Sequence, residues 1–165
     1  MVLDHVNKIA YASLSQRTHP EALKAFCVDF GYEPVTFRSE SAPGRPIYHT
    51  NVMMCLGTNF ALVGLEMIPD PAQRQTVQRR LEASGREIVP LSPSQIENFA
   101  GNALELQGEE GKVLVLSARA LAHLGEAERA TIERVARLLP LELPTIEMAG
   151  GSARCMLAAI HLRPR

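Results

Sequence analysis

The feature that most constrains the fold is a pattern that occurs twice along the chain, about fifty residues apart. The stretch NVMMCLGTNFALV begins at Asn51 and aligns with NALELQGEEGKVLV, which begins at Asn102; in each, an asparagine precedes an apolar strand, a turn and a second apolar strand. A helical pattern and a further strand pattern follow each stretch. Because one helix covers only one face of so small a sheet, such ββαβ units bury their other face by packing around a common centre.

The repeat indicates an α/β fold made of ββαβ modules. A chain of 165 residues has about the size of one domain, so we expect a single domain that holds the repeats together. A strand, a helix and a strand precede the first full unit, and one apolar strand follows the second. The expected division is a partial module over 1–40, ββαβ modules over 47–92 and 102–147, and a closing strand over 153–162.

Local signals place the remaining elements. Thr18 is the expected N-cap of a helix that ends before Gly31, and Asp70 followed by Pro71 marks the start of another helix. Composition and periodicity predict the rest. The expected elements are a loop over 39–46, a helix over 126–139 and a strand over 141–147.

Charge and hydropathy argue against two classes of partner. The chain has 17 Lys and Arg against 18 Asp and Glu, a net charge of −1, and no long basic run. We therefore expect neither a nucleic-acid surface nor a polybasic membrane patch. No segment approaches the roughly 20 apolar residues that cross a bilayer, and the N-terminus lacks the pattern of a secretory signal. The expected localisation is cytoplasmic, with small-molecule or protein partners.

The cysteines are few, and one has an unusual context. They stand at 27, 55 and 155 without a CxxC pair, which indicates free thiols rather than a zinc or dithiol centre. Cys155 lies in GGSARCML, after two glycines and beside Arg154. A thiolate nucleophile needs a positive neighbourhood and an accessible, fixed position, which this context predicts. The alternative is a buried structural thiol, because cysteine is among the most buried residue types.

Two further segments place polar side chains at the entrances of predicted strands. In IYHTNV, His49 and Asn51 are two residues apart and would share one face of a strand, combining a proton carrier with a group that holds a substrate. The alternative for His49 is a half-buried histidine with one hydrogen bond. In IENFAGNALEL, Asn102 occupies the place in its repeat that Asn51 occupies in the preceding one, so we expect both to face the same centre.

The segments PIYHTNVMMC, IENFAGNALEL and GGSARCMLA, in this order and each at a predicted strand entrance, resemble the pentein superfamily of arginine deiminases and amidinotransferases. The resemblance is greatest to bacterial citrulline-utilisation or amidinotransferase-like hydrolases and extends over essentially the whole chain. It implies an α/β-propeller in which five ββαβ modules surround a central channel that holds the active site. This chain would form about half of that ring, its C-terminal half.

The resemblance also implies roles for individual residues. Cys155 corresponds to the nucleophile, His49 to the general acid/base, and Asn51 to the group that holds a guanidinium, where many arginine deiminases carry aspartate. Apart from the resemblance, Asn102, from its equivalent place in the repeat, and Arg45, as a partner for a substrate carboxylate, complete the expected site. Arg154 could bind the same carboxylate, and the alternative for both arginines is a surface or structural role. The implied chemistry is hydrolysis of a C–N bond in a guanidino or ureido compound through a covalent intermediate on Cys155, without a metal or organic cofactor.

The same resemblance sets the expectations for activity and assembly. The acidic residues that grip the guanidinium are expected in the other half of the ring, so we expect impaired activity from this chain alone. If the chain is active alone, Glu66 or Glu105 would replace those residues. The alternative function is a catalytically silent fragment or an assembly subunit. The substrate stays open among arginine, citrulline, methylated arginine and agmatine. About half of a ring is an open arc, which exposes strand edges and apolar faces. We therefore expect a homo-oligomer that covers them.

Overall fold

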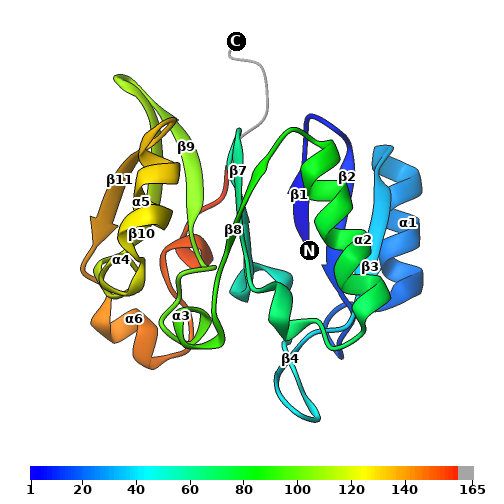
Figure 1. Ribbon diagram of the computed structural model, residues 1–165. Helices are drawn as coiled ribbons and strands as arrows, with labels where there is room; N and C mark the ends of the chain where they lie inside the picture. The colour runs from blue at the N-terminus through cyan, green and yellow to red at the C-terminus, as the bar shows by residue number, and fades with distance from the viewer. Residues whose placement is uncertain (160–165) are drawn as a thin grey trace.

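The computed structural model describes residues 1–159, and within them one arrangement occurs three times (Figure 1). The first unit contains β1 (Val2–Asp4), β2 (Ile9–Ser13), α1 (Pro20–Phe30) and β3 (Glu33–Phe37). The second contains β6 (Met54–Leu56), β7 (Phe60–Val63), α2 (Pro71–Ala83) and β8 (Glu87–Pro90). The third contains β9 (Leu104–Gly108), β10 (Gly111–Ser117), α4 (Ala118–His123), α5 (Glu126–Glu133) and β11 (Arg137–Leu141).

Short elements connect and follow these units. They are β4 (Glu40–Ala42), β5 (Arg45–Pro46), the 3₁₀ helix η1 (Thr50–Val52), the 3₁₀ helix η2 (Leu65–Met67), α3 (Pro93–Glu97), α6 (Pro144–Met148) and the 3₁₀ helix η3 (Ala153–Met156). The segments around η1, α3 and η3 carry most of the residues that the sequence indicates as functional.

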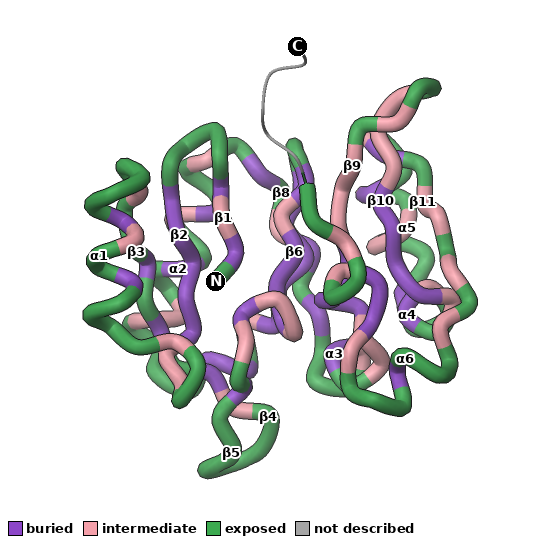
Figure 2. Tube along the Cα trace, turned by 180° about the vertical axis from the view of Figure 1, so that it is seen from behind, coloured by how far each residue is buried: buried purple, intermediate pink, exposed green. Residues whose placement is uncertain are grey.

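All three sheets have the same topology. The second strand of each unit is central, and it pairs antiparallel with the first strand and parallel with the third. The parallel pair requires a crossover, which the helix of each unit provides. Every residue of β2 and of β7 is buried, as are the last four residues of β10, and the buried colour is seen along β2 and this part of β10 in Figure 2. The mixed α/β class predicted from the repeat is confirmed.

The units pack against one another rather than standing alone. Helix α2 contacts β8 of its own sheet and β3 of the preceding sheet, and β6 contacts both β1 and β9. One cluster of buried apolar side chains extends from Val2 through the second sheet to Ala136. The first strands of the three units therefore lie next to one another, and the described residues share one main core.

A buried ion pair joins the first unit to the second. Arg86, just before β8, donates from Nη1 to Asp4 Oδ2 over 2.5 Å and from Nε to the Gly57 carbonyl over 2.8 Å. The side chains of Arg86 and Asp4 are 7% and 0% exposed. Burial raises the pKa of Asp4, but hydrogen bonds from Arg86 and Asn7 outweigh burial, so that the pKa lies below its ordinary value.

The structure corrects the expected start of the chain. Residues 1–40 contain β1 in addition to the predicted strand, helix and strand, so the first sheet has three strands like the other two. A strand of three residues is too short for an alternating pattern to be recognised. The N-cap of α1 is His19 rather than Thr18, because the His19 Nδ1 accepts a hydrogen bond from the Glu21 backbone N–H over 3.3 Å.

Four expectations about connecting and C-terminal segments are also wrong. The helix expected over 126–139 ends at Glu133, and 137–139 belong to β11. Residues 39–46, expected as a loop, contain the short hairpin of β4 and β5. The strand expected over 141–147 is instead the end of β11 followed by α6, which begins at Pro144 because proline suits the first helical turn. The closing strand expected over 153–162 begins as η3, and 160–162 lie outside the described residues.

Candidate active site

A cavity of about 200 Å3 lies where three separate segments meet. They are the segment before and within η1, the end of α3 with the loop after it, and the turn that carries Cys155. Of the residues predicted for the site, the cavity brings together Cys155, His49, Asn51 and Asn102. Arg45, in the exposed β4–β5 hairpin, is not among its lining residues. The lining residues are Ser41, Ile47, Tyr48, His49, Asn51, Val52, Met67, Ile96, Glu97, Phe99, Asn102, Gly150 and Cys155.

The Cys155 turn is fixed by local contacts. Gly150 has a φ of +86°, a left-handed conformation that favours glycine and lets the chain reverse after α6. The buried Ser152 hydroxyl donates to Glu147 Oε1 over 3.0 Å, and the Cys155 backbone N–H donates to the Ser152 carbonyl over the same distance. Cys155 itself is exposed. An accessible thiol on a fixed turn is the arrangement that a nucleophile requires.

The other two cysteines have the opposite environment. Cys27 and Cys55 are buried. Burial raises the pKa of Cys27, and it raises the pKa of Cys55 to about 12. Cys27 and Cys55 are therefore buried structural thiols, whereas Cys155, for which the sequence leaves both interpretations open, is exposed and lines a cavity.

Asn102 connects the turn that carries Cys155 to the segment that carries His49 and Asn51. The residue is only 3% exposed. Its Nδ2 group donates to the Asn51 carbonyl over 3.0 Å and lies 3.4 Å from the Cys155 sulfur, and its Oδ1 accepts from the Arg154 backbone N–H over 3.1 Å. Asn102 is thus in contact with both segments that carry the predicted catalytic residues.

The loop before Asn102 needs a glycine because two backbones approach closely. A Cβ atom on Gly101 would lie 2.5 Å from the Val52 carbonyl oxygen and 2.9 Å from the Met53 backbone. Phe99, two residues earlier, has a φ of +65°, which is rare for a residue with a side chain. The turn is therefore held tightly against η1, and this packing determines the position of Asn102.

His49 lies at the N-cap of η1 rather than on a strand, so the expectation that it shares a strand face with Asn51 is wrong. Both residues nevertheless line the cavity. The His49 ring is half-buried, with its centroid 4.9 Å from that of the Tyr48 ring. Burial lowers the pKa of His49, and the positive charges of Arg17 and the N-terminal amine lower it further. The imidazole is therefore mainly neutral near pH 7 and able to accept a proton.

The carboxylate of the cavity comes from a residue that the sequence argument missed. Glu97, the last residue of α3, lines the cavity together with Cys155. The two acidic residues expected to replace lost carboxylates lie elsewhere. Glu66, in η2, is exposed and does not line this cavity. Glu105 accepts hydrogen bonds from Thr58, including one from its backbone N–H over 3.1 Å.

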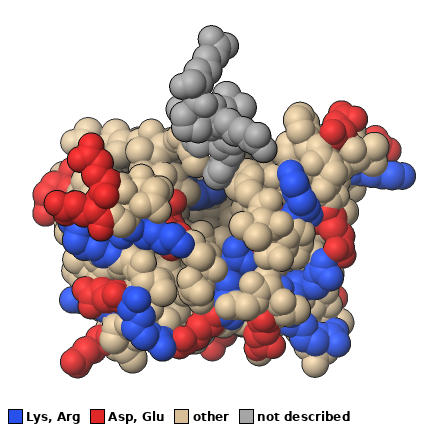
Figure 3. Space-filling view, turned by 90° about the horizontal axis from the view of Figure 1, so that it is seen from above, with Lys and Arg blue, Asp and Glu red and all other residues tan. Residues whose placement is uncertain are grey.

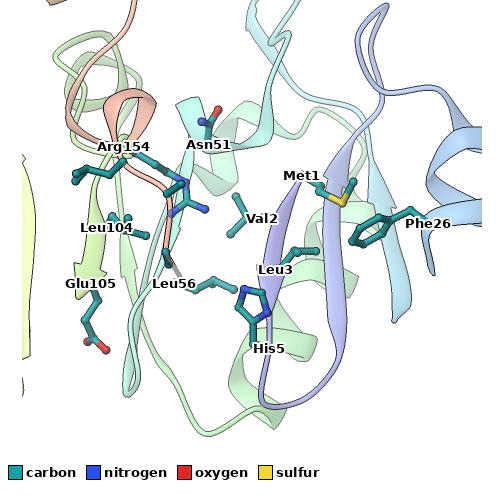
Figure 4. A pocket seen from close by; sticks show the side chains of 13 residues that line it. Met1, Val2, Leu3, His5, Phe26, Asn51, Leu56, Leu104, Glu105 and Arg154 are labelled. Atoms are coloured by element: carbon teal, nitrogen blue, oxygen red, sulfur yellow. The ribbon is translucent and has the colours of Figure 1, made fainter. Parts of the chain in front are cut away.

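The side chain of Arg154 faces a second, larger cavity. This cavity has a volume of about 510 Å3, and residues of β1, β6 and β9 line it together with Asn51 (Figure 4). Arg154, which stands beside Cys155 in the sequence, therefore does not line the cavity that Cys155 lines. Seen from above, the molecule is hollowed near its middle, with Lys and Arg side chains at the edge of the hollow (Figure 3). Asn51 lines both cavities, so the two adjoin at this residue.

Within residues 1–159, no group of three or more His, Cys, Asp and Glu side chains is arranged to hold a metal ion. Among the helices of these residues, none is long and apolar enough to cross a membrane.

Several solved structures share this fold. Apo ArgZ, an arginine dihydrolase from the ornithine-ammonia cycle in cyanobacteria, matches with a TM-score of 0.73 at 16% identity, over 94% of this chain and 23% of that one. The N-terminal domain of ArgZ with a cysteine-to-serine substitution, bound to substrate, matches with a TM-score of 0.68 at 18% identity, over 93% and 52%. Unliganded AgrE matches with a TM-score of 0.71 at 18% identity, over 93% and 21%. This chain thus spans from about a fifth to about half of those chains.

The sequence itself matches a family model. Residues 1–162 match the model described as N,N dimethylarginine dimethylhydrolase, eukaryotic, whereas no curated protein matches the sequence. At identities below 20%, the solved structures show a shared fold, and the family model adds a match in sequence over nearly the whole chain. The protein therefore belongs to the N,N dimethylarginine dimethylhydrolase family, and its resemblance to the pentein superfamily is confirmed.

Proposed function

We propose that the chain carries the nucleophile and the proton-transferring group of a hydrolase that acts on guanidino compounds. The observation that carries the proposal is that Cys155, His49 and Glu97, from three separate segments, line one cavity of about 200 Å3. A thiol, an imidazole and a carboxylate are suited to nucleophilic attack on a cationic guanidino carbon. The family is named for hydrolysis of dimethylarginine, and ArgZ is an arginine dihydrolase, which supports the same chemistry.

In the first half of the proposed reaction, Cys155 forms a bond to the substrate. Burial and Arg17 lower the pKa of His49, so its ring is neutral near pH 7, and a neutral imidazole has a free nitrogen that can accept the thiol proton. The thiolate attacks the planar guanidino carbon, and an S–C bond forms. The C–N bond to the leaving amine or ammonia breaks as His49 donates its proton to that nitrogen, which leaves a covalent thiouronium group on the sulfur.

In the second half, water replaces the sulfur. His49, neutral again, takes a proton from water, and the water oxygen forms a bond to the same carbon. The S–C bond then breaks, and its electron pair returns to the sulfur of Cys155. The protonated ureido product loses the proton of its new hydroxyl group to solvent, and His49 returns its own proton to the thiolate, which restores the thiol and the neutral imidazole.

The lining of the cavity suits a cationic, planar group. The Glu97 carboxylate can pair with the positive charge of a guanidinium, and this charge is needed because Asn51 stands where many arginine deiminases carry aspartate. The Phe99 ring also lines the cavity and offers an aromatic surface to a cation. Ile47, Val52, Met67 and Ile96 supply apolar walls. The proposed substrate class is therefore arginine and its N-methylated or decarboxylated relatives.

The proposal extends to the architecture around the site. We infer that the three ββαβ units form an arc of a propeller-like ring, with β1, β6 and β9 on its inner side, where they line the 510 Å3 cavity. The half-buried apolar side chains of Leu3, Leu56 and Leu104 in this cavity favour contact with a second copy of the chain. Size-exclusion chromatography with light scattering should therefore report a dimer at micromolar concentration, and a monomer there would refute this part.

Release of ammonia or alkylamine from arginine, dimethylarginine and agmatine tests the proposed function. We expect release by the wild-type chain and only background release by Cys155→Ser. Glu97→Gln should lower kcat/KM about 10- to 100-fold, because it removes a charge-assisted contact worth about 1.5–3 kcal/mol. Glu66→Gln is the matched control, since Glu66 is exposed and does not line the cavity. Undiminished release by Cys155→Ser would exclude the nucleophile, and no release by the wild type would favour the silent assembly subunit.

A further inference from the structure

Asn102 lies between the two segments that carry the proposed nucleophile and the proposed general acid/base. One hydrogen of its Nδ2 group is directed to the Asn51 carbonyl over 3.0 Å, two residues from His49. The same group lies 3.4 Å from the Cys155 sulfur. A single side chain thus spans the short gap between these two parts of the site.

The hydrogen-bonding groups of Asn102 are already occupied. An asparagine side chain has two N–H donors and one carbonyl oxygen. Both donors face protein atoms, as described, and the oxygen accepts from the Arg154 backbone N–H over 3.1 Å. The backbone carbonyl of Asn102 also accepts from Arg154 N–H, over 3.3 Å. Little capacity is left for a substrate, so a role as a direct substrate ligand, which the sequence predicts, is not the one that the geometry favours.

We propose that Asn102 is a positioning residue that stabilises the thiolate form of Cys155 and holds its turn against the His49 segment; this inference rests on the proposed function. A hydrogen bond donated to a thiolate favours the charged form over the neutral one. When the sulfur is protonated, it can donate to Asn102 Oδ1, which lies 3.6 Å away. The side chain therefore serves both protonation states of the nucleophile without moving.

The surroundings of Asn102 keep it in place. Asn102 is 3% exposed, and its backbone N–H donates to the Phe99 carbonyl over 2.9 Å. The preceding Gly101 lies so close to the Val52 carbonyl that no side chain fits there. A fixed donor loses little entropy when the thiolate forms, which is why pre-organised groups are effective at charged sites.

Alkylation of Cys155 with iodoacetamide, followed over a range of pH by peptide mass spectrometry, tests this role without turnover. We expect Asn102→Ala to react about 3- to 10-fold more slowly than wild type at pH 7, because a hydrogen bond to a charged group is lost. The pH of half-maximal rate should move upward, and the rates of all variants should converge at high pH. Asn102→Asp keeps the volume but replaces the donor by a negative charge, so it should be slower still.

Asn98→Ala is the matched control from the same segment. The Asn98 side chain donates to the Ser94 carbonyl and accepts from Arg119, away from Cys155, so we expect wild-type alkylation. The buried Cys27 and Cys55 report the fold, because they should react only if it opens. An Asn102→Ala variant that keeps these two protected, yet alkylates Cys155 at pH 7 as fast as wild type with an unchanged profile, would overturn the proposal. A failure of the proposed function would instead appear as absent product release, with the alkylation profiles still separated.

Discussion

The close approach of Gly101 to η1 predicts that Gly101→Ala disrupts the candidate site from outside the cavity. The added Cβ would lie 2.5 Å from the Val52 carbonyl oxygen, whereas ordinary contact begins at 3.4 Å, so the two backbones must separate by about 0.9 Å. Backbone atoms cannot rotate away as the end of a side chain can. The separation would lengthen the 3.0 Å hydrogen bond from Asn102 Nδ2 to the Asn51 carbonyl beyond bonding distance.

Overpacking and the lost hydrogen bond together give the expected loss in the free energy of unfolding. Overpacking costs about 1–3 kcal/mol, and the lost hydrogen bond adds about 1 kcal/mol, so we expect Gly101→Ala to lower the free energy of unfolding by about 2–4 kcal/mol. For a chain of this length, that loss corresponds to a decrease of about 5–15 °C in Tm. Alkylation of Cys155 at pH 7 should also slow, as for Asn102→Ala.

Urea unfolding and thermal unfolding measure the effect, with Gly125→Ala as the matched control. The nearest atom to a Cβ at Gly125 is Glu128 Oε2 at 3.4 Å, an ordinary contact with a movable side-chain end. Because Gly125 is an N-cap, its replacement by alanine should cost about 0.5 kcal/mol. If Gly101→Ala were as stable as Gly125→Ala, with unchanged alkylation of Cys155, the argument that backbone packing positions Asn102 would be refuted.

Other perturbations test the buried ion pair and the environment of His49. Arg86→Met leaves the Asp4 carboxylate buried without its cation, so urea unfolding should show a loss of about 3–5 kcal/mol, and a loss below about 1 kcal/mol would contradict this. Because the folded pKa of Asp4 is lowered, its contribution to stability is present above the unfolded value of 3.8 and is lost as the pH falls through the lower folded value; an acid titration in which Asp4→Asn responds like wild type would disagree. Arg17→Gln removes one cause of the lowered pKa of His49, so the NMR titration midpoint of its ring should move upward. Cys155 should alkylate before the other two thiols, since they are buried.

Signals that act within a few residues predict their elements well. Asp70 before Pro71 predicts the start of α2, and Asp70 Oδ1 indeed accepts from the Ala72 backbone N–H over 2.8 Å. Gly31 predicts the end of α1 and has the left-handed φ of +68°. Both hairpins of the repeat are also found, between β6 and β7 and between β9 and β10. In each case the interaction that determines the element joins residues that are close together in the sequence.

The carboxylate of the cavity could not be recognised in the same way, because its role depends on distant segments. Glu97 is one of many exposed acidic residues in the sequence, and only the packing of α3 beside the Cys155 turn brings it to the cavity. A signal for α3 was nevertheless present. Ser92 and Gln95 form a capping box, a pattern that marks a helix start from sequence alone.

The direction of the Arg154 side chain could not be predicted from the sequence either. Adjacency in sequence suggested a positive neighbour for Cys155, but successive residues of a turn point to different sides. The 3₁₀ helix η3 directs Arg154 to the 510 Å3 cavity and Cys155 to the 200 Å3 cavity. The sequence predicts a strand here, whereas residues 153–156 form a 3₁₀ helix. The backbone conformation of this helix decides which cavity each side chain lines.

Mass spectrometry of acid-quenched reactions tests the central claim, that Cys155 attacks a guanidino carbon, most directly. Wild-type chain is mixed with arginine or dimethylarginine, quenched in acid after increasing times, and digested for peptide mapping. We expect the peptide with Cys155 to gain the mass of the substrate less that of the leaving amine, and we expect Cys155→Ser to gain nothing. A wild-type chain that releases product while Cys155 stays unmodified at every time, or an adduct found on Cys27 or Cys55, would contradict the account.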